Sequence, residues 1–331
     1  MKKWILYGLV SMIHSWQAQC ESISASMLST ATVTATEPRL AGSLIAPMGT
    51  VVPYRDVVVR SYLYLTTHTG DYNQRGRVCS DEENFYSLKA QFQYFVGLNS
   101  WCDLNVVPQF LLNTTSNQYY FNAGDLTVGL DFQLMPDDFT SYFPGVKLAI
   151  REVLPTGNFQ RFSPRKLFAD ETGFGTFATQ FNLVLYKLFH LRALYWASAT
   201  VSAQYTLNTP RDVHGFNAYG GGFGTKGKVI PGNGFQGIIS FELTLNKNWA
   251  VALDNIYQYI NATEFIGIPG ISFYGTFADI GSPFSEQFSF APALEYHWSQ
   301  SIRLIAGSWL SAWGRNSTKF RSGVVDFEYV Y

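Results

Sequence analysis

The chain has 331 residues, of which 17% are aromatic and only 14% charged, and its net charge is −1. Soluble domains carry about 25% charged residues, so charge is scarce in this sequence. Its mean hydropathy is nevertheless zero, whereas a bundle of membrane helices would be far more hydrophobic. Strands that alternate apolar and polar residues average to such neutrality, which favours a transmembrane β-barrel. The near-zero net charge argues against a nucleic-acid partner.

Residues 1–20 have the pattern of a signal peptide. Lys2 and Lys3 precede an apolar stretch over 4–13 that is too short to span a bilayer as a helix. Ala18 and Cys20 are the small residues expected before a cleavage site. The alternative, lipidation at Cys20, fits poorly with Gln19 in front of it. We therefore expect an exported protein.

Residues 21–55 predict an N-terminal periplasmic leader. They are rich in Ser, Thr and Ala, contain prolines at positions 38, 47 and 53, and show no sustained periodicity. Such a leader is either mobile or tucks into the barrel mouth. The two cysteines that follow, Cys79 and Cys102, could form a disulfide in an exported protein. The strand assignment places them at opposite ends of the barrel, so we expect two free thiols.

Residues 56–331 contain amphipathic stretches that recur about every twenty residues. The clearest covers 122–134, where alternation places Leu130 toward lipid and Asp131 toward the lumen. Pro108 cannot donate a ladder hydrogen bond and predicts a local irregularity in its strand. The twelve predicted strands form an all-β, antiparallel, up-and-down barrel, and single-chain bacterial barrels have even strand numbers. They cover 56–68, 84–98, 101–113, 122–134, 146–154, 174–188, 193–207, 234–245, 249–260, 286–298, 301–313 and 317–331.

The connections between these strands alternate in length. Short ones lie near 99–100, 189–191, 246–248 and 299–300, and long ones near 70–83, 155–172, 208–232 and 263–283. Outer-membrane barrels have short periplasmic turns and longer outer loops. The pattern therefore predicts that both termini of the barrel lie in the periplasm.

The last strand ends on alternating aromatic residues, Phe327, Tyr329 and Tyr331. This ending resembles the C-terminal strand of bacterial outer-membrane barrels, which carries the signal for barrel assembly. Those strands usually end in Phe, so Tyr331 departs from the pattern. The resemblance implies the barrel-assembly machinery as a partner. The alternative is a soluble β-sandwich, whose exposed aromatic edge would invite aggregation.

Two short motifs resemble a known family. Residues 150–157 run from a strand into an outer loop through Leu154-Pro155-Thr156-Gly157, and residues 124–130 resemble the preceding strand of the same family. The family is the outer-membrane group named for the MetA pathway of phenol degradation, whose members are labelled transporters, and the similarity covers roughly 120–330. It implies an outer-membrane barrel that is a channel for small compounds, aromatic ones among them, and it supplies no catalytic residues.

Charged residues on the predicted strands face one side. A basic side chain in hydrocarbon costs roughly 2–4 kcal/mol at the bilayer midplane, so this side must be the lumen. The set either selects solutes or forms a salt-bridged plug, since a lumen of this size can be filled by side chains. The lumen-lining candidates are Arg60, Lys89, Asp103, Asp125, Asp131, Lys147, Arg151, Glu242, Asp254, Glu295, His297, Arg303, Asp326 and Glu328.

These patterns predict a channel for passive passage of small, including hydrophobic or aromatic, solutes. One alternative is a non-conducting surface or structural barrel of an adhesin-like kind. Another is an outer-membrane lipid hydrolase, but none of His68, His190, His214 and His297 sits beside a plausible serine with an acidic orienter. We expect no catalytic residues, metal or cofactor. The expected partners are outer-membrane lipid and a small-molecule solute.

Overall fold

The computed structural model describes residues 40, 42–79, 85–115, 118–138, 141–166, 168–192 and 195–331. These residues belong to one compact unit, Pro38–Tyr331. The predicted signal peptide lies outside the described residues. Within the described part of the chain, no helix is long and apolar enough to cross a membrane.

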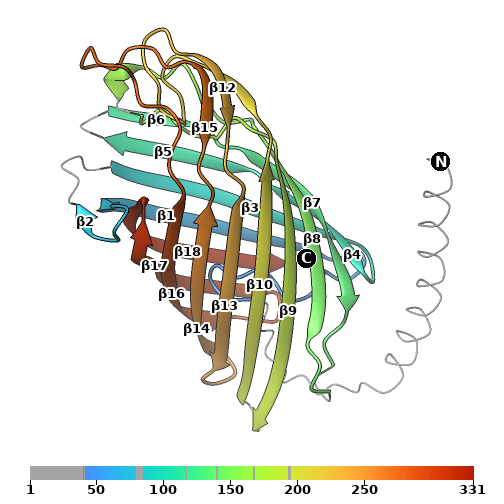
Figure 1. The fold of residues 1–331 in the computed structure, drawn as a ribbon. Helices are drawn as coiled ribbons and strands as arrows, with labels where there is room; N and C mark the ends of the chain where they lie inside the picture. Colours follow the sequence, from blue (N-terminus) through green and yellow to red (C-terminus); the bar gives the residue numbers. More distant parts are fainter. Residues whose placement is uncertain are drawn as a thin grey trace, which may run out of the picture. The chain divides into compact units, whose positions relative to one another are not determined.

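The strands form an antiparallel sheet that closes on itself, because β1 pairs with β18 on one side and with β3 on the other (Figure 1). At the seam, the backbone amides of Val57 and Tyr331 donate to each other's carbonyls over 3.0 and 2.8 Å. The strands of the wall are β1 (Val57–Tyr72), β3 (Phe85–Asn99), β4 (Cys102–Val107), β5 (Gln109–Thr115), β6 (Gln118–Ala123), β7 (Leu126–Met135), β8 (Gly145–Leu154), β9 (Ala178–Arg192), β10 (Tyr195–Asn208), β13 (Gly234–Thr244), β14 (Trp249–Ile260), β16 (Ser285–His297), β17 (Ile302–Arg315) and β18 (Ser317–Val330).

Two positions in the wall are occupied by broken strands. β4 and β5 both pair with β3 and are separated at Pro108, where the sequence predicts an irregularity. β6 and β7 pair with β5 and β4 and are separated at Gly124 and Asp125. With each broken pair counted once, the described wall has the twelve positions that the hydrophobic pattern predicts.

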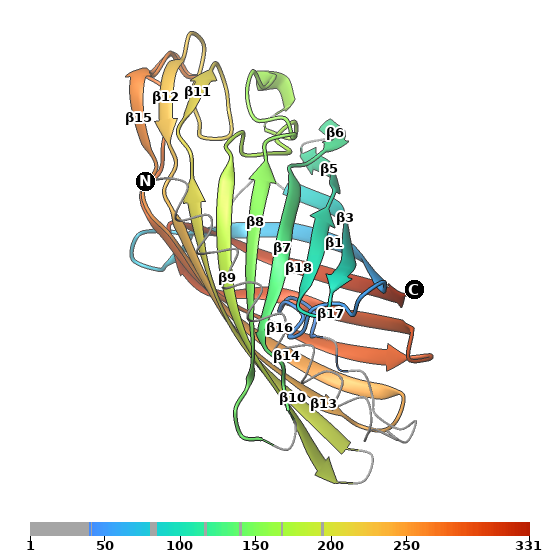
Figure 2. The ribbon, with the colours of Figure 1, turned by 90° about the vertical axis from the view of Figure 1, so that its right-hand side faces the viewer.

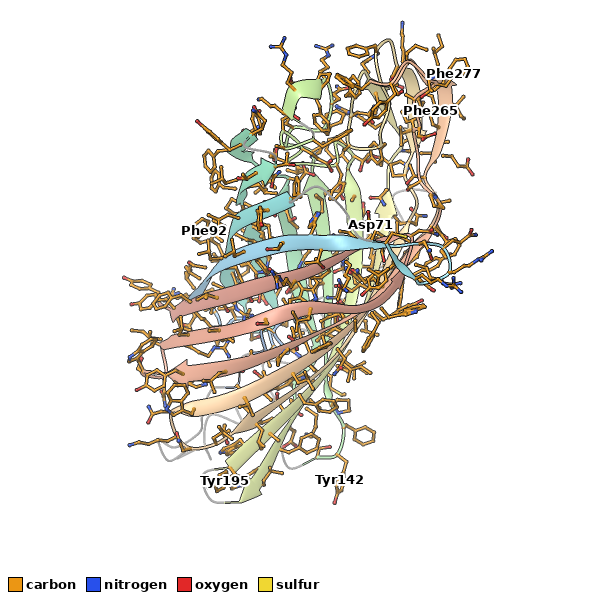
Figure 3. All side chains as sticks on the ribbon, turned by 90° about the vertical axis from the view of Figure 1, so that its left-hand side faces the viewer. Asp71, Phe92, Tyr142, Tyr195, Phe265 and Phe277 are labelled. Atoms are coloured by element: carbon orange, nitrogen blue, oxygen red, sulfur yellow. The ribbon has the colours of Figure 1, made fainter. Side chains whose placement is uncertain are left out.

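The long connections carry structure of their own. β11 (Arg211–His214), β12 (Lys226–Ile230) and β15 (Glu264–Ile268) form a separate three-stranded sheet beyond the ends of β9 and β10 (Figure 2). A short 3-10 helix, η1 (Pro164–Lys166), lies in the connection from β8 to β9, and the two-residue strand β2 (Val78–Cys79) pairs with β1. The sequence predicted only loops in these regions. Figure 3 shows Phe265 and Phe277 at this end and Tyr142 and Tyr195 at the opposite end, which carries the short turns. We assign the end with short turns to the periplasm.

The two faces of the wall differ in polarity. Leu130 is 37% exposed on the outside, whereas its neighbour Asp131 is fully buried, as the alternation predicts. Apolar side chains such as Leu63, Phe241 and Phe327 continue this outer surface around the wall. Such a surface is stable only against hydrocarbon, so the fold is that of a transmembrane β-barrel of the outer-membrane type.

The register of β7 can be tested by placing a charge on each face. Leu130→Arg should lower the yield of folded barrel in liposomes, because arginine in hydrocarbon costs roughly 2–4 kcal/mol near the midplane. The matched control is Thr127→Arg on the same strand, whose side chain lines an internal cavity and should be tolerated. Heat-modifiable mobility on gels measures the folded fraction. Normal folding of Leu130→Arg together with failure of Thr127→Arg would show that the register is wrong.

Candidate functional site

Residues 42–55, here called the inner segment, cross the interior of the barrel (Figure 2). The carboxylate of Asp254 on β14 accepts hydrogen bonds from the hydroxyl of Ser43 and from the amide of Ile45, the latter over 2.7 Å. On the other side of the lumen, Asp103 on β4 accepts from the amide of Val52 over 2.8 Å. These lumenal carboxylates satisfy the backbone amides of Ile45 and Val52, which have no partner in a strand ladder.

The inner segment also packs through apolar side chains. Leu44 is fully buried and belongs to a cluster that includes Ile256 and Ile305 of the wall. Glycines in the wall make room for it. A Cβ on Gly307 would lie 2.8 Å from Leu44 Cδ2, and one on Gly97 would lie 1.9 Å from the carbonyl oxygen of Pro53. The segment therefore fills the interior near the periplasmic end.

The leader was expected either to be mobile or to tuck into the barrel, and its last part is found inside the barrel. Residues 42–52 run through the interior of the barrel, Pro53, Tyr54 and Arg55 are exposed, and residues 21–39 lie outside the described residues. The boundary between leader and barrel at 55/56 remains a prediction. The segment is held by side chains of distant wall strands and forms no strand or helix of its own. Its sequence therefore shows no hydrophobic periodicity from which its position could be predicted.

Near the inner segment, buried charges form a network on β1, β16, β17 and β18. Arg60 Nε donates to Asp326 Oδ2 over 2.8 Å, and Arg303 Nη2 donates to Glu328 Oε2 over 2.7 Å. Arg303 also lies 3.5 Å from Glu295. These residues are at most 3% exposed. Removing one partner of such a buried pair typically costs about 3–5 kcal/mol, because the other charge is left without compensation.

A second group of charges lies on β7 and β8. Asp131 Oδ2 is 3.1 Å from Lys147 Nζ and 2.9 Å from Arg151 Nη2. Close to it, Lys187 donates to Asp137 over 2.7 Å in the region of the short turns. Asp131 therefore compensates two basic groups, and it contributes to the stability of the barrel as well as to the charge of the lumen.

The remaining lumen candidates have individual surroundings. The carboxylate of Glu242 accepts from the hydroxyl of Ser198, and His297 Nε2 lies 3.5 Å from Glu295. Asp125 sits at the break between β6 and β7, where its two oxygens accept from backbone amides of the β8–β9 loop. The structure thus places all the candidates in the interior, and their role as the lining of a solute path stays a proposal.

The outer half of the lumen contains a cavity of about 960 Å³ between the strand ends and the outer loops. Its described lining mixes the apolar side chains Phe85, Leu111 and Phe174 with polar ones. Its charged lining includes Lys89 from β3, Asp125 from the break between β6 and β7, and Glu171 from the β8–β9 loop. Lys89 forms no ion pair within 4.0 Å with either carboxylate. No residue of the inner segment appears among the described lining residues.

The β8–β9 loop brings Glu171 to this cavity. Asn113 Nδ2 on β5 donates to the carbonyl oxygens of Ala169 and Glu171 over 3.2 and 2.6 Å, which holds the loop against the wall. Burial and, less strongly, the neighbouring carboxylate of Asp170 together raise the pKa of the Glu171 carboxyl to about 7. The sequence gives no indication of Glu171, because a single acidic residue in a long loop carries no periodic signal.

The cysteines and two of the histidines lie in surroundings that differ from a catalytic or metal site. Cys79 is exposed and Cys102 is buried, and both thiols are free, as the strand assignment predicts. His68 stacks on Phe85, and His190 on Trp196. Among the residues that the structure describes, no group of three or more His, Cys, Asp or Glu side chains could hold a metal ion.

The described geometry defines a class of protein, a closed transmembrane β-barrel with a polar interior. Neither a scan against protein-family models nor a search of curated proteins gives a match. The fold is similar to the crystal structure of an outer-membrane channel from Pseudomonas putida F1. That likeness has a TM-score of 0.64 and 13% identity, and it covers 86% of this chain and 98% of the other.

Two other solved structures are less similar to this fold, with TM-scores below 0.5. The transport unit of the autotransporter AIDA-I from Escherichia coli has a TM-score of 0.43 and 12% identity, covering 88% of this chain and 95% of that one. A mutant of the monoaromatic hydrocarbon channel TodX has a TM-score of 0.36 and 13% identity, covering 84% and 91%. The comparisons therefore place the chain among outer-membrane β-barrels by fold, and the resemblance to the MetA-pathway family gains no matching family model.

The raised pKa of Glu171 predicts a pH-dependent charge in the outer cavity. Above the pKa of about 7 the carboxylate is negative, and below it the group is neutral. Reversal potentials across a KCl gradient should therefore become less cation-favouring when the pH falls from about 8 to about 6. Glu171→Gln should weaken this dependence, whereas the exposed Glu264→Gln should keep it. His68→Gln is measured in parallel because His68 lines the same cavity. An unchanged pH dependence in Glu171→Gln would contradict the assignment.

Proposed function

We propose that the protein is an outer-membrane channel through which small solutes diffuse passively. The observation that carries the proposal is the internal cavity of about 960 Å³ beneath the outer loops. Cavities of about 300–1,000 Å³ enclose small organic molecules. A barrel whose only role were structural would gain stability by filling this space with side chains, since unfilled volume costs packing energy.

The lining favours small solutes with hydrophobic or aromatic parts. Phe85, Leu111, Phe168 and Phe174 offer apolar contact, and polar side chains between them keep the surface wettable. The resemblance of residues 124–130 and 150–157 to the MetA-pathway family agrees with this class of solute. The likeness to the Pseudomonas putida channel supports the fold, and at 13% identity it carries no solute.

Passage to the periplasm requires movement of the inner segment, because this segment occupies the lumen below the cavity. Its polar anchors are separate hydrogen bonds to the wall, with Asp103, Gln133 and Asp254 accepting from its amides and Arg60 donating to the carbonyl oxygen of Ser43. The wall strands are held by their own ladders, which the segment does not join, and we expect the barrel to stay closed when the segment leaves. A second candidate, a non-conducting surface or structural barrel, is favoured by the same filling of the periplasmic half.

The outer face fits the proposed partners of such a channel. Phe327, Tyr329 and Tyr331 are 42%, 39% and 82% exposed on the outside of the closing strand. We assign to them the contact with the barrel-assembly machinery during insertion and with outer-membrane lipid afterwards.

A reversible lock on the inner segment tests the channel. The hydroxyl oxygens of Ser43 and Ser240 on β13 are 2.7 Å apart, so cysteines at both positions are placed to form a disulfide. In a background with Cys79→Ser and Cys102→Ala, the reduced double variant should give stepwise currents in planar bilayers. Oxidation should abolish them, and dithiothreitol should restore them.

The matched control for this experiment is Ser43→Cys alone, which should conduct under both conditions. Equal currents from the oxidised and reduced double variant would show that solutes do not pass where the segment lies. Silence of every variant, with normal heat-modifiable folding, would favour the non-conducting barrel.

A further inference from the structure

Lys89 is the one cation on the wall strands around the outer cavity whose described surroundings contain no carboxylate partner. It lies in the middle of β3, half-buried, and its side chain lines the cavity. Its ammonium group stands 4.1 Å from the centroid of the Tyr64 ring on the neighbouring strand β1. A ring face attracts an ammonium group but accepts none of its three N–H donors as a full hydrogen bond.

Other basic residues in the described lumen are compensated. Arg60, Lys147, Arg151, Lys187 and Arg303 each lie within 3.5 Å of a carboxylate oxygen. Lys89 forms no such ion pair within 4.0 Å among the described residues. Buried charges in proteins are ordinarily paired, so an unpaired ammonium that faces a cavity is a site for an anion.

Two polar side chains near Lys89, those of Ser87 and Gln109, donate to other groups. Ser87 donates to Asn113 Oδ1 over 2.8 Å, and Gln109 donates to the carbonyl oxygen of Asp125 over 2.8 Å. These bonds hold the wall and the break at Asp125 in place, which leaves the ammonium group of Lys89 to bind a ligand. Opposite Lys89 on β5, the side chain of Leu111 offers apolar contact.

We infer that Lys89 binds the carboxylate of small monocarboxylates whose apolar or aromatic body fills the rest of the outer cavity. The inference rests on the proposed function and names its class of solute. Leu111, Phe168 and Phe174 line the cavity and supply contact for the apolar body. The carboxylates of Asp125 and Glu171 line the same cavity and disfavour a second negative group on the ligand, which favours molecules with one carboxylate.

Equilibrium dialysis of the folded, detergent-solubilised protein against radiolabelled benzoate tests the inference without requiring transport. Lys89→Met keeps the length of the side chain and removes its charge, and it should weaken benzoate binding at least about tenfold, the effect of losing one charge-assisted contact. Lys89→Arg should retain binding. The matched control is Lys228→Met, which removes a charge from the exposed face of β12 and should bind benzoate normally.

Benzyl alcohol serves as the uncharged probe of the same size. Its binding should be weak and should not change in Lys89→Met. Benzoate binding that is unaffected by Lys89→Met, or benzyl alcohol binding that falls equally with it, would overturn the inference.

Single-channel currents of the same preparations separate the two proposals. Currents without Lys89-dependent benzoate binding would sink the assigned solute class and leave the channel standing. Lys89-dependent binding in a barrel that never conducts would establish the site and contradict the proposed channel.

Discussion

The arrangement of side chains inside this barrel depends on one constraint. The carboxylates of the wall must face the interior, and there each one needs a cation or a hydrogen-bond donor. A charge on the outer face would lie in hydrocarbon, so the acidic residues of the strands face inward. Asp131, Asp326 and Glu328 are compensated by basic side chains of neighbouring strands. Asp103 and Asp254 instead accept hydrogen bonds from the inner segment. At the periplasmic end, the segment that fills the lumen is therefore also the group that supplies hydrogen bonds to the buried carboxylates of Asp103 and Asp254.

This arrangement divides the molecule into parts held by different forces. The wall is held by strand ladders, interrupted at Pro108 and at Gly124-Asp125, and by ion pairs between adjacent strands. The inner segment is held mainly by hydrogen bonds to side chains of the wall and by the apolar cluster that surrounds Leu44. Above it lies the outer cavity, and the β8–β9 loop that lines this cavity is hydrogen-bonded to the wall through Asp125 and Asn113. Among the described residues, the inner segment lies between this cavity and the end of the barrel assigned to the periplasm.

The sequence predicted the wall well, for a physical reason. Alternation with a period of two follows directly from the strand geometry, so Leu130 and Asp131 could be assigned to opposite faces. Pro108 marked a real interruption because it lacks an amide donor. The charged residues expected in the lumen lie in the interior.

Features that depend on contacts distant in sequence were not predictable. The inner segment has no periodicity, and nothing in its residues indicates that Asp254, over two hundred positions away, accepts from Ile45. The pairing of β11, β12 and β15 in the outer loops was missed, because strands of four or five residues give too little pattern. The isolation of Lys89 was invisible as well, since a sequence lists charges without showing which of them are compensated.

The central claim is that the inner segment can leave its seat while the wall stays folded. Hydrogen–deuterium exchange of the native protein in lipid tests it most directly, because exchange reports local opening. Peptides covering 42–55 should exchange at least about tenfold faster than peptides from β14, since the segment opens at a lower free-energy cost than the ladders. Equal protection of the segment and the wall would mean that both open only together, and it would contradict a displaceable segment.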